Sequence, residues 1–271
     1  MQWVHSIAPH ANILLVIANS SRFSDLLTAV QCAKANADVV TNSYGAPEFS
    51  SQTSADSLLS STVPVLYSAG DAYLVTQWPC SSPNVTCVGG TNLLETSTTH
   101  RNGESVWDES AFTCGTGNCG GTGGGCSAFE TEPLFQSGFT TCGSQRGVPD
   151  IAAIADEFTG VLIYLGTNAG GVGGTSDSLY VFGGTSLASP VMAGVVADID
   201  ASRVAADKGI LGGSAPFNLA TDLYKAAGNP FYHYRFYDVT TGVGAAAGWD
   251  DVTGLGVTLN PALTFYLDSL P

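Results

Sequence analysis

Short apolar runs that alternate with a helix-like segment constrain the fold of this chain more than any other feature. The runs Ile13–Ala18, Asp38–Ser43, Val63–Ser68 and Val85–Val88 have the length and residue types of buried strands. Between the first two runs, Ser24–Asn36 has an amphipathic helical pattern with Ser24 as the expected N-cap. This order predicts an α/β fold on a parallel sheet, whose ligand sites form at the carboxyl ends of strands.

The second half of the chain continues the same pattern after an irregular middle. Residues 102–147 are rich in Gly, Cys, Ser and Thr, which predicts loops held by disulfides. Asp150–Ala155 and Val161–Leu165 resume strand-like character, and Pro190–Val204 is expected to be a helix with Pro190 in its first turn. Because 271 residues contain no repeat or long linker, we expect a single domain over residues 1–271.

Acidic residues outnumber basic ones, with 23 Asp and Glu against 8 Lys and Arg, for a net charge of −15. Nucleic-acid binding needs a basic surface, so this function class is disfavoured. Such a chain loses much of its negative charge at about pH 4, where carboxylates titrate, and this suits an acidic extracellular setting. No apolar run is long enough to span a membrane, so no membrane partner is expected.

Six of the seven cysteines lie in loop-like stretches, at spacings that suggest local disulfides. The expected pairs are Cys80 with Cys87, Cys114 with Cys119, and Cys126 with Cys142, while Cys32 is expected to be a buried free thiol. A zinc site is the weaker alternative, because the histidines do not cluster with the cysteines. Disulfides indicate an oxidising compartment, so we expect a secreted protein.

A glycine turn, Gly183-Gly184-Thr185-Ser186, precedes the predicted helix and carries the strongest chemical signal. A serine displayed at such a turn lies beside the free N–H groups of the helix N-terminus, as a nucleophile requires. The alternative is a glycine loop with a serine that caps the helix. A nucleophilic serine also needs a base for its proton and donors for the oxyanion.

Eight ordered segments resemble the sedolisins, the serine-carboxyl peptidases that share the subtilisin fold. They are Trp3-Val4-His5-Ser6-Ile7-Ala8-Pro9, Ser43-Tyr44-Gly45, Ser68-Ala69-Gly70-Asp71, Ser81-Ser82-Pro83 with Val88-Gly89-Gly90-Thr91, Gly123-Gly124-Gly125-Cys126-Ser127, Arg146-Gly147-Val148-Pro149-Asp150, Gly184-Thr185-Ser186 with Pro190, and Asp238-Val239-Thr240 with Gly248-Trp249-Asp250. The resemblance implies a subtilisin-like parallel sheet with helices on both faces. A subtilisin that uses histidine is disfavoured, because His5, His10, His100 and His233 all lack the His-Gly-Thr setting.

The resemblance implies a role for each residue of this chain that matches a functional position of the family's motifs. Ser186 matches the nucleophile and Asp71 the oxyanion-hole aspartate, which can donate a hydrogen bond only when it is protonated. Ser43-Tyr44-Gly45 and Gly184-Thr185 match segments that flank the substrate, where exposed backbone can pair with an extended peptide. The alternatives are a turn-forming aspartate and glycines that simply permit turns.

The family's base is a glutamate oriented by an aspartate, on a helix upstream of the segment that matches Trp3–Pro9. This chain starts at Met1, so we expect a peptidase domain that lacks its N-terminal part, as a fragment or a mis-started gene. Such a chain is expected to hydrolyse little, because losing one member of a nucleophile–base unit costs about as much as losing all of it. The glutamates that follow Trp3–Pro9 do not match the position of the base.

The resemblance also implies one calcium ion near the C-terminus. Its expected ligands are the carboxylates of Asp238 and Asp250 and the carbonyls of Val239, Ala246 and Gly248, completed by water. The family usually has glycine where Ala246 stands. The alternative is a pair of solvated loop aspartates.

The expected function is therefore a secreted, monomeric, calcium-stabilised serine-type endopeptidase that cleaves peptide or protein substrates at acidic pH. The alternative is a non-catalytic peptide-binding homologue or an inactive fragment.

Overall fold

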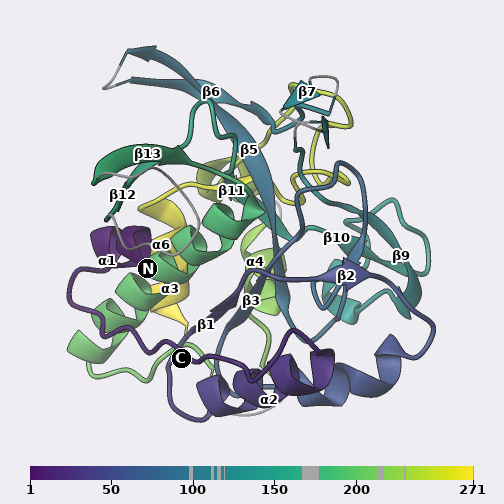
Figure 1. The fold of residues 1–271 in the computed structure, drawn as a ribbon, viewed down its shortest axis with the longest axis vertical. Helices are drawn as coiled ribbons and strands as arrows, with labels where there is room; N and C mark the ends of the chain where they lie inside the picture. The colour runs from purple at the N-terminus through teal and green to yellow at the C-terminus, as the bar shows by residue number, and fades with distance from the viewer. Residues whose placement is uncertain are drawn as a thin grey trace.

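A seven-stranded sheet forms the centre of the computed structural model, which describes residues 1–97, 100–110, 113–114, 117–118, 120–166, 177–212, 217–228 and 230–270 (Figure 1). The strand order is β1-β3-β5-β11-β15-β14, and β6 pairs with β5. Their bounds are β1 (Val40–Asn42), β3 (Val65–Ser68), β5 (Thr86–Ser97), β6 (His100–Val106), β11 (Ile151–Ile154), β14 (Phe236–Tyr237) and β15 (Val257–Thr258). The five strands from β1 to β15 are parallel, and β6 and β14 are antiparallel, so the predicted sheet is confirmed.

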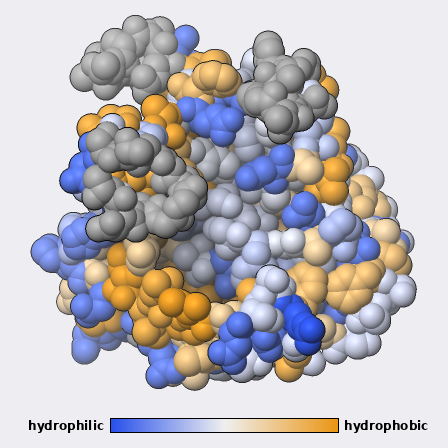
Figure 2. All heavy atoms as spheres, in the orientation of Figure 1, coloured by the Kyte–Doolittle hydropathy of each residue, from blue (hydrophilic) through white to orange (hydrophobic). Residues whose placement is uncertain are grey.

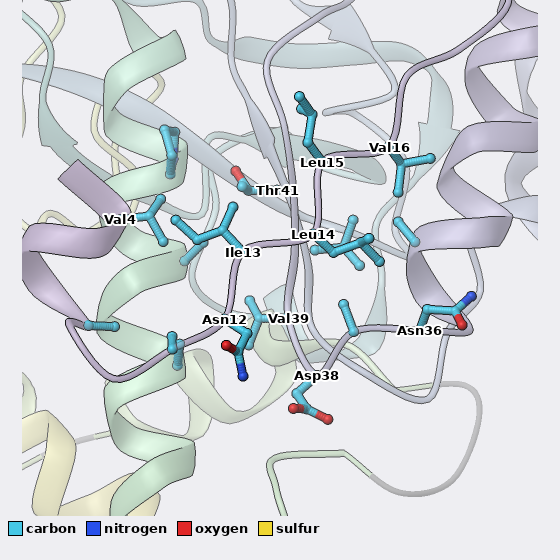
Figure 3. Close-up of a pocket in the computed structure, with 18 of the residues that line it drawn as sticks. Val4, Asn12, Ile13, Leu14, Leu15, Val16, Asn36, Asp38, Val39 and Thr41 are labelled. Atoms are coloured by element: carbon cyan, nitrogen blue, oxygen red, sulfur yellow. The ribbon is translucent and has the colours of Figure 1, made fainter. Parts of the chain in front are cut away.

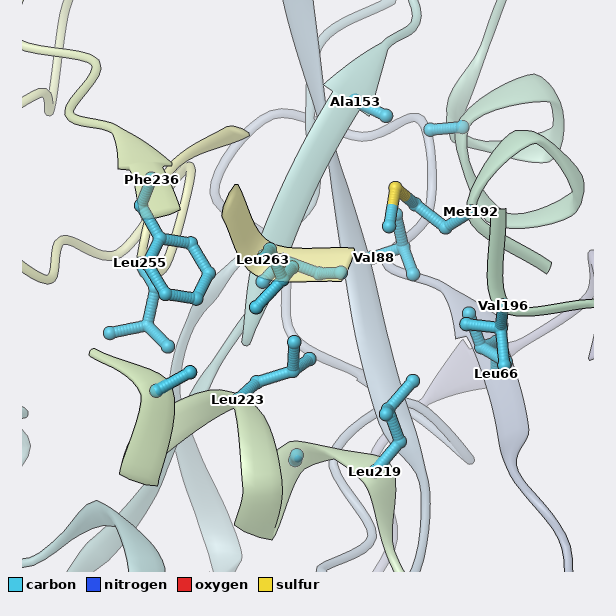
Figure 4. Close-up of a cluster of buried hydrophobic side chains, with 14 of the residues drawn as sticks. Leu66, Val88, Ala153, Met192, Val196, Leu219, Leu223, Phe236, Leu255 and Leu263 are labelled. Carbon is cyan, nitrogen blue, oxygen red and sulfur yellow. The ribbon is translucent and has the colours of Figure 1, made fainter. Parts of the chain in front are cut away.

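Helices cover both faces of the sheet, as predicted. Side chains alternate along β3: Val65 and Tyr67 pack in the cluster that contains α2, while Leu66 packs in the cluster that contains α3 (Figure 4). The helices are α1 (Gln2–Ile7), α2 (Phe23–Lys34), α3 (Thr185–Ala205), α4 (Leu219–Ala226), α5 (Tyr232–Arg235) and α6 (Ala262–Ser269). No helix among the described residues is both long and apolar enough to cross a membrane.

Short hairpins and two 3₁₀ helices surround this framework. The paired strands are β2 (Ala46–Pro47) with β4 (Gln77–Trp78), β7 (Thr113–Cys114) with β8 (Gly117–Asn118), β9 (Gly125–Thr131) with β10 (Gln145–Val148), and β12 (Val161–Leu165) with β13 (Ser178–Phe182). The 3₁₀ helices are η1 (Gln52–Leu58) and η2 (Leu134–Gln136). The predicted strand Val161–Leu165 therefore exists, but it lies outside the main sheet.

The predicted buried strand Ile13–Ala18 is wrong. Residues 11–18 have no regular structure, and Ile13, Leu14, Leu15 and Ile17 are 42%, 54%, 61% and 80% exposed. An apolar sequence becomes a strand only when its backbone groups pair with a neighbour. The edge strand β1 pairs with β3 and with no other described segment, and residues 12–18 make none of the described backbone hydrogen bonds.

Two of the three expected disulfides are present, Cys80–Cys87 and Cys126–Cys142. Cys119, the expected partner of Cys114, lies outside the described residues. Cys32 is a free thiol as predicted, but it is exposed rather than buried. The helix geometry explains this: Val30 faces the core, and a residue two positions further lies about 200° around the axis.

Both predicted helix starts are shifted, that of α2 by one residue and that of α3 by five. Ser24 is not the N-cap of α2, because the helix begins at Phe23 after Arg22 and has no side-chain cap. Helix α3 begins at Thr185, so Pro190 lies inside the helix rather than in its first turn. Pro190 lacks the N–H that would pair with the carbonyl of Ser186.

Candidate active site

The serine turn lies at the carboxyl end of the central strand β11. The amide of Gly184 donates to the carbonyl of Ala155, which directly follows this strand. Gly184 is the N-cap of α3 and has a φ of +83°, a conformation that glycine adopts readily. Ser186 therefore stands in the first turn of α3, at the edge of the sheet where α/β proteins place their ligand sites.

Thr185 connects Asp71 to this turn. Oδ1 of Asp71 accepts hydrogen bonds from the amide of Thr185 at 2.8 Å and from its hydroxyl at 2.7 Å. The same hydroxyl accepts a bond of 3.0 Å from the amide of Gly70. Asp71 follows β3 and Thr185 begins α3, so three short bonds fix the predicted oxyanion residue beside the predicted nucleophile.

The second oxygen of Asp71 faces Gly184. A β-carbon at Gly184 would lie 2.8 Å from Oδ2 of Asp71, so a side chain at this position would displace the Asp71 carboxyl. Because Oδ1 already accepts two hydrogen bonds, a proton on this carboxyl belongs on Oδ2. The amide of Ser186 makes none of the described backbone hydrogen bonds, so it is the second available donor in the first turn of α3.

Ser43 also contacts the serine turn. Its hydroxyl donates to the carbonyl of Ser186 at 3.2 Å, the carbonyl that Pro190 leaves without a helical partner. Tyr44 follows, and its hydroxyl lies 2.8 Å from that of Tyr67. Burial raises the pKa of both phenols, so both stay protonated.

Gln77 of β4 is a site neighbour that the sequence did not reveal. A β-carbon at Gly45 or at Gly70 would lie 2.8 Å or 2.7 Å from its amide group, so both glycines admit this side chain between the Tyr44 loop and the Asp71 loop. No pattern in the sequence around Gln77 identifies it as a neighbour of the site, because only folding brings the Tyr44 and Asp71 loops together. The segment Gly123-Gly124-Gly125 lies close by, since the amide of Gly123 donates to the carbonyl of Gly70 at 2.8 Å.

None of the histidine side chains that the structure describes serves Ser186. His5, His10 and His233 are exposed, and no hydrogen bond recorded for the described residues joins Ser186 to an imidazole. The geometry therefore gives no support to a histidine-based triad.

Asp238 and Asp250, the two carboxylates predicted to bind calcium, accept hydrogen bonds from the amides of Gly248 and Ala246. The amide of Gly248 donates to both oxygens of Asp238 at 3.2 and 3.1 Å, and the amide of Ala246 donates to Oδ2 of Asp250 at 3.0 Å. Asp238 also accepts a bond of 3.2 Å from the hydroxyl of Tyr232, whose pKa is raised by burial and by both carboxylates.

The charge of these two aspartates is not balanced by a Lys or Arg in any ion pair of the described residues. Burial raises the pKa of Asp250, which is only 4% exposed. Carboxylate and carbonyl oxygens are the donors that calcium prefers, so the donor set fits this ion.

Fold and site together define an α/β protein with a serine at a helix N-terminus and a carboxyl group beside it, an arrangement suited to serine-type acyl transfer. The chain belongs to the subtilase family, whose family profile matches residues 1–205. The resemblance to the sedolisins is confirmed by its relatives among known proteins.

One such relative is sedolisin of Pseudomonas sp. (strain 101), 36% identical over 208 residues, which cover 75% of this chain and 32% of the relative. Another is kumamolisin of Bacillus sp. (strain MN-32), 29% identical over 282 residues, which cover 93% of this chain and 47% of the relative. The chain thus spans about a third to a half of the length of these relatives.

The structure is similar to Pseudomonas sedolisin, a serine-carboxyl proteinase complexed with two molecules of pseudo-iodotyrostatin. The TM-score is 0.79 at 28% sequence identity, and the match covers 98% of this chain and 76% of the other. The subtilisin-like fold predicted from the motifs is therefore confirmed.

Proposed function

We propose that this chain carries the nucleophile and the oxyanion hole of a serine-carboxyl endopeptidase that acts on peptides at acidic pH. The observation that carries the proposal is the pair of hydrogen bonds from Thr185 to Oδ1 of Asp71, which fixes this carboxyl beside the Ser186 turn. The family membership and the similarity to a serine-carboxyl proteinase support it.

In the proposed reaction, the hydroxyl oxygen of Ser186 attacks the carbonyl carbon of the scissile peptide bond. The resulting oxyanion accepts hydrogen bonds from the amide of Ser186 and from the protonated Oδ2 of Asp71. Low pH is required because an ionised Asp71 would repel the oxyanion. The resemblance assigns the base that takes the serine proton to a glutamate, whose carboxylate is still substantially ionised at about pH 4 and can accept a proton, whereas a histidine would already be protonated.

A peptide aldehyde labelled with ¹³C at its carbonyl carbon tests the nucleophile directly. Addition of Ser186 to the aldehyde gives a hemiacetal with its own carbon resonance, and we expect this resonance at about pH 4. Ser186→Ala should abolish it, while Ser202→Ala, a serine change on the exposed part of the same helix, should leave it unchanged.

Asp71→Asn extends the test to the oxyanion hole. An amide donates a hydrogen bond at every pH, so this variant should keep aldehyde binding at neutral pH, where the unchanged chain loses it. Absence of the hemiacetal, with equal affinity for the aldehyde and the matching peptide alcohol, would instead establish a non-catalytic peptide-binding protein.

The same proposal includes a calcium ion held by Asp238, Asp250 and the carbonyls of Val239, Ala246 and Gly248. It would stabilise the C-terminal loop by neutralising two carboxylates that have no described ion-pair partner, and it takes no part in the proposed chemistry. Secretion as a monomer is also proposed, with support for secretion from the two disulfides.

A further inference from the structure

The loop that carries Asp71 is mostly exposed. It comprises residues 70–76 and follows β3, and the side chains of Asp71, Ala72, Leu74 and Val75 are all exposed. Leu74 has a φ of +55°, in the left-handed region that a leucine adopts only at a cost in free energy. Such a loop keeps one conformation only when contacts with the rest of the chain hold it.

Tyr73 anchors the middle of the Asp71 loop. Its ring packs against a small buried cluster, which is formed by Val106, Val239 and Val252. Its hydroxyl donates a hydrogen bond of 2.7 Å to the carbonyl of Val243, 170 residues further along the chain. This side chain therefore attaches the Asp71 loop to the C-terminal part of the chain.

The side chain of Tyr73 also lies on the backbone segment that binds the Asp71 loop. The amide of Gly121 donates to the carbonyl of Asp71 at 3.3 Å, and the amide of Leu74 donates to the carbonyl of Thr122 at 3.1 Å. A β-carbon at Gly121 would lie 2.9 Å from the β-carbon of Tyr73, so a side chain there would push Tyr73 away. The two backbone hydrogen bonds thus lie on either side of Tyr73 in the loop sequence.

These contacts affect the oxygen of Asp71 that Thr185 does not hold. Thr185 donates two hydrogen bonds to Oδ1, whereas none of the hydrogen bonds recorded for the described residues reaches Oδ2. The position of Oδ2 therefore depends on the backbone of the Asp71 loop. A displacement of about 1 Å in a group that takes part in a reaction can lower the rate about 100-fold, so the anchoring of this loop matters.

We propose that Tyr73 is a positioning residue, which holds the Asp71 loop on the C-terminal segment so that Oδ2 of Asp71 faces the oxyanion. The proposal rests on the function proposed for Ser186 and Asp71. Because Tyr73 acts through Asp71, loss of its hydroxyl should weaken only the binding of ligands that form a tetrahedral adduct with Ser186. Binding of a peptide that forms no adduct should be unchanged.

Tyr73 lies apart from the large groove beside β1. This groove has a volume of about 1220 Å³ and lies between β1 and residues 10–18 (Figure 3). Figure 2 shows hydrophobic side chains gathered at the lower left of this face, over the N-terminal segment. Ser43 and Tyr44 line the groove, whereas Tyr73 and Val243 do not. A change at Tyr73 therefore tests the Asp71 loop without altering the lining of the groove.

The test compares the whole chain with its Tyr73→Phe variant, which keeps the ring and removes the hydroxyl. Affinities for the ¹³C-labelled peptide aldehyde and for the matching peptide alcohol are measured at about pH 4. We expect Tyr73→Phe to bind the aldehyde about fivefold to tenfold more weakly and the alcohol equally well. Tyr234→Phe is the matched control and should change neither affinity, because Tyr234 is 71% exposed.

Two further comparisons show whether the effect passes through Asp71. In an Asp71→Ala background the donor is absent, so Tyr73→Phe should leave the aldehyde affinity unchanged. Gly121→Ala inserts a methyl group against Tyr73 and should weaken aldehyde binding in the same way as Tyr73→Phe. Gly209→Ala is its control, because a β-carbon there meets no atom within 4 Å.

Amide hydrogen exchange of the ligand-free chain measures the loop itself. The amides of Leu74 and Gly121 form the two backbone hydrogen bonds beside Tyr73, so both should exchange faster in Tyr73→Phe. The same amides should exchange at the original rate in Tyr234→Phe.

Three results would overturn the proposal. They are equal aldehyde affinity of Tyr73→Phe and the unchanged chain, equal weakening of aldehyde and alcohol binding, and an undiminished effect of Tyr73→Phe in the Asp71→Ala background. A chain that forms no hemiacetal at all would instead reject the function proposed for Ser186. Faster exchange in Tyr73→Phe would then still show that Tyr73 holds the loop.

Discussion

The hydroxyl of Ser43 donates a hydrogen bond of 3.2 Å to the backbone carbonyl of Ser186. Within α3 this carbonyl would be paired with the residue four positions further, which is Pro190 and has no N–H. The end of β1 therefore supplies the hydrogen bond that the helix cannot make. Ser43, the residue after β1, thus takes the place of the missing helical donor.

Ser43→Ala should lower the free energy of unfolding by about 1 kcal/mol, because it leaves this carbonyl without a partner. Pro190→Ala supplies the missing N–H, so in that background Ser43→Ala should cost much less. Urea unfolding of the two single variants and the double variant measures the coupling. Equal costs in both backgrounds would show that the carbonyl does not depend on Ser43.

Thr185 should act as a positioning residue for Asp71. Thr185→Val removes the hydroxyl that binds Oδ1 of Asp71 and the amide of Gly70, and it should weaken peptide-aldehyde binding by about tenfold at acidic pH. Thr185→Ser keeps the hydroxyl and should bind nearly as tightly as the unchanged chain. If Val and Ser variants of equal stability bind equally, the hydroxyl has no role in the site.

Local sequence signals predicted most of the fold, and they placed Asp71 and Ser186 at the same edge of the sheet. Asp71 comes shortly after β3 and Ser186 lies in the first turn of α3, so the packing of these elements brings the two residues to one edge of the sheet. Nearby cysteines such as Cys80 and Cys87 were paired correctly because their separation leaves few other partners.

The failures have a different physical origin, because they depend on neighbours that no local pattern reveals. Ile13–Ala18 has the composition of a strand, but the groove separates it from β1. Gln77 meets Gly45 and Gly70 only through the hairpin of β2 and β4. Cys32 was misplaced because an apolar helical pattern does not by itself define which face is buried.

Stability should fall as the pH rises from about 4.5 to about 7. The pKa of Glu130 is raised to about 7, mainly by burial and also by the nearby carboxyls of Asp56 and Glu48. The amide of Gln52, which donates a hydrogen bond of 2.7 Å to Glu130, acts in the opposite direction. The folded chain therefore binds more protons than the unfolded chain in this interval. The contribution of Glu130 to the free energy of unfolding is complete below about pH 4.5 and is lost as the pH rises through about 7. Burial, followed by Asp156, raises the pKa of Glu109 to about 7, with the same sign.

Urea unfolding between about pH 4 and pH 8 measures this slope. Glu130→Gln removes one titrating group and should flatten the curve, while Asp207→Asn, a change at an exposed position, serves as the control. A slope that Glu130→Gln leaves unchanged would assign the pH dependence to other groups.

Calcium should raise the melting temperature, and EDTA should lower it, if the loop around Asp238 and Asp250 binds the ion. At free calcium of about 100 times Kd, binding adds roughly 2.7 kcal/mol to the stability of the folded state. Asp238→Asn removes a charge without disturbing the four hydrogen bonds that Asp250 accepts, so this variant should fold yet lose the response. Asp222→Asn, which breaks only the surface ion pair with Lys225, should keep the response to EDTA. Two results together would show that the loop does not bind calcium: equal melting temperatures with calcium and with EDTA, and no heat of calcium binding in calorimetry. The two aspartates would then be loop residues that only accept hydrogen bonds from the amides of Ala246 and Gly248.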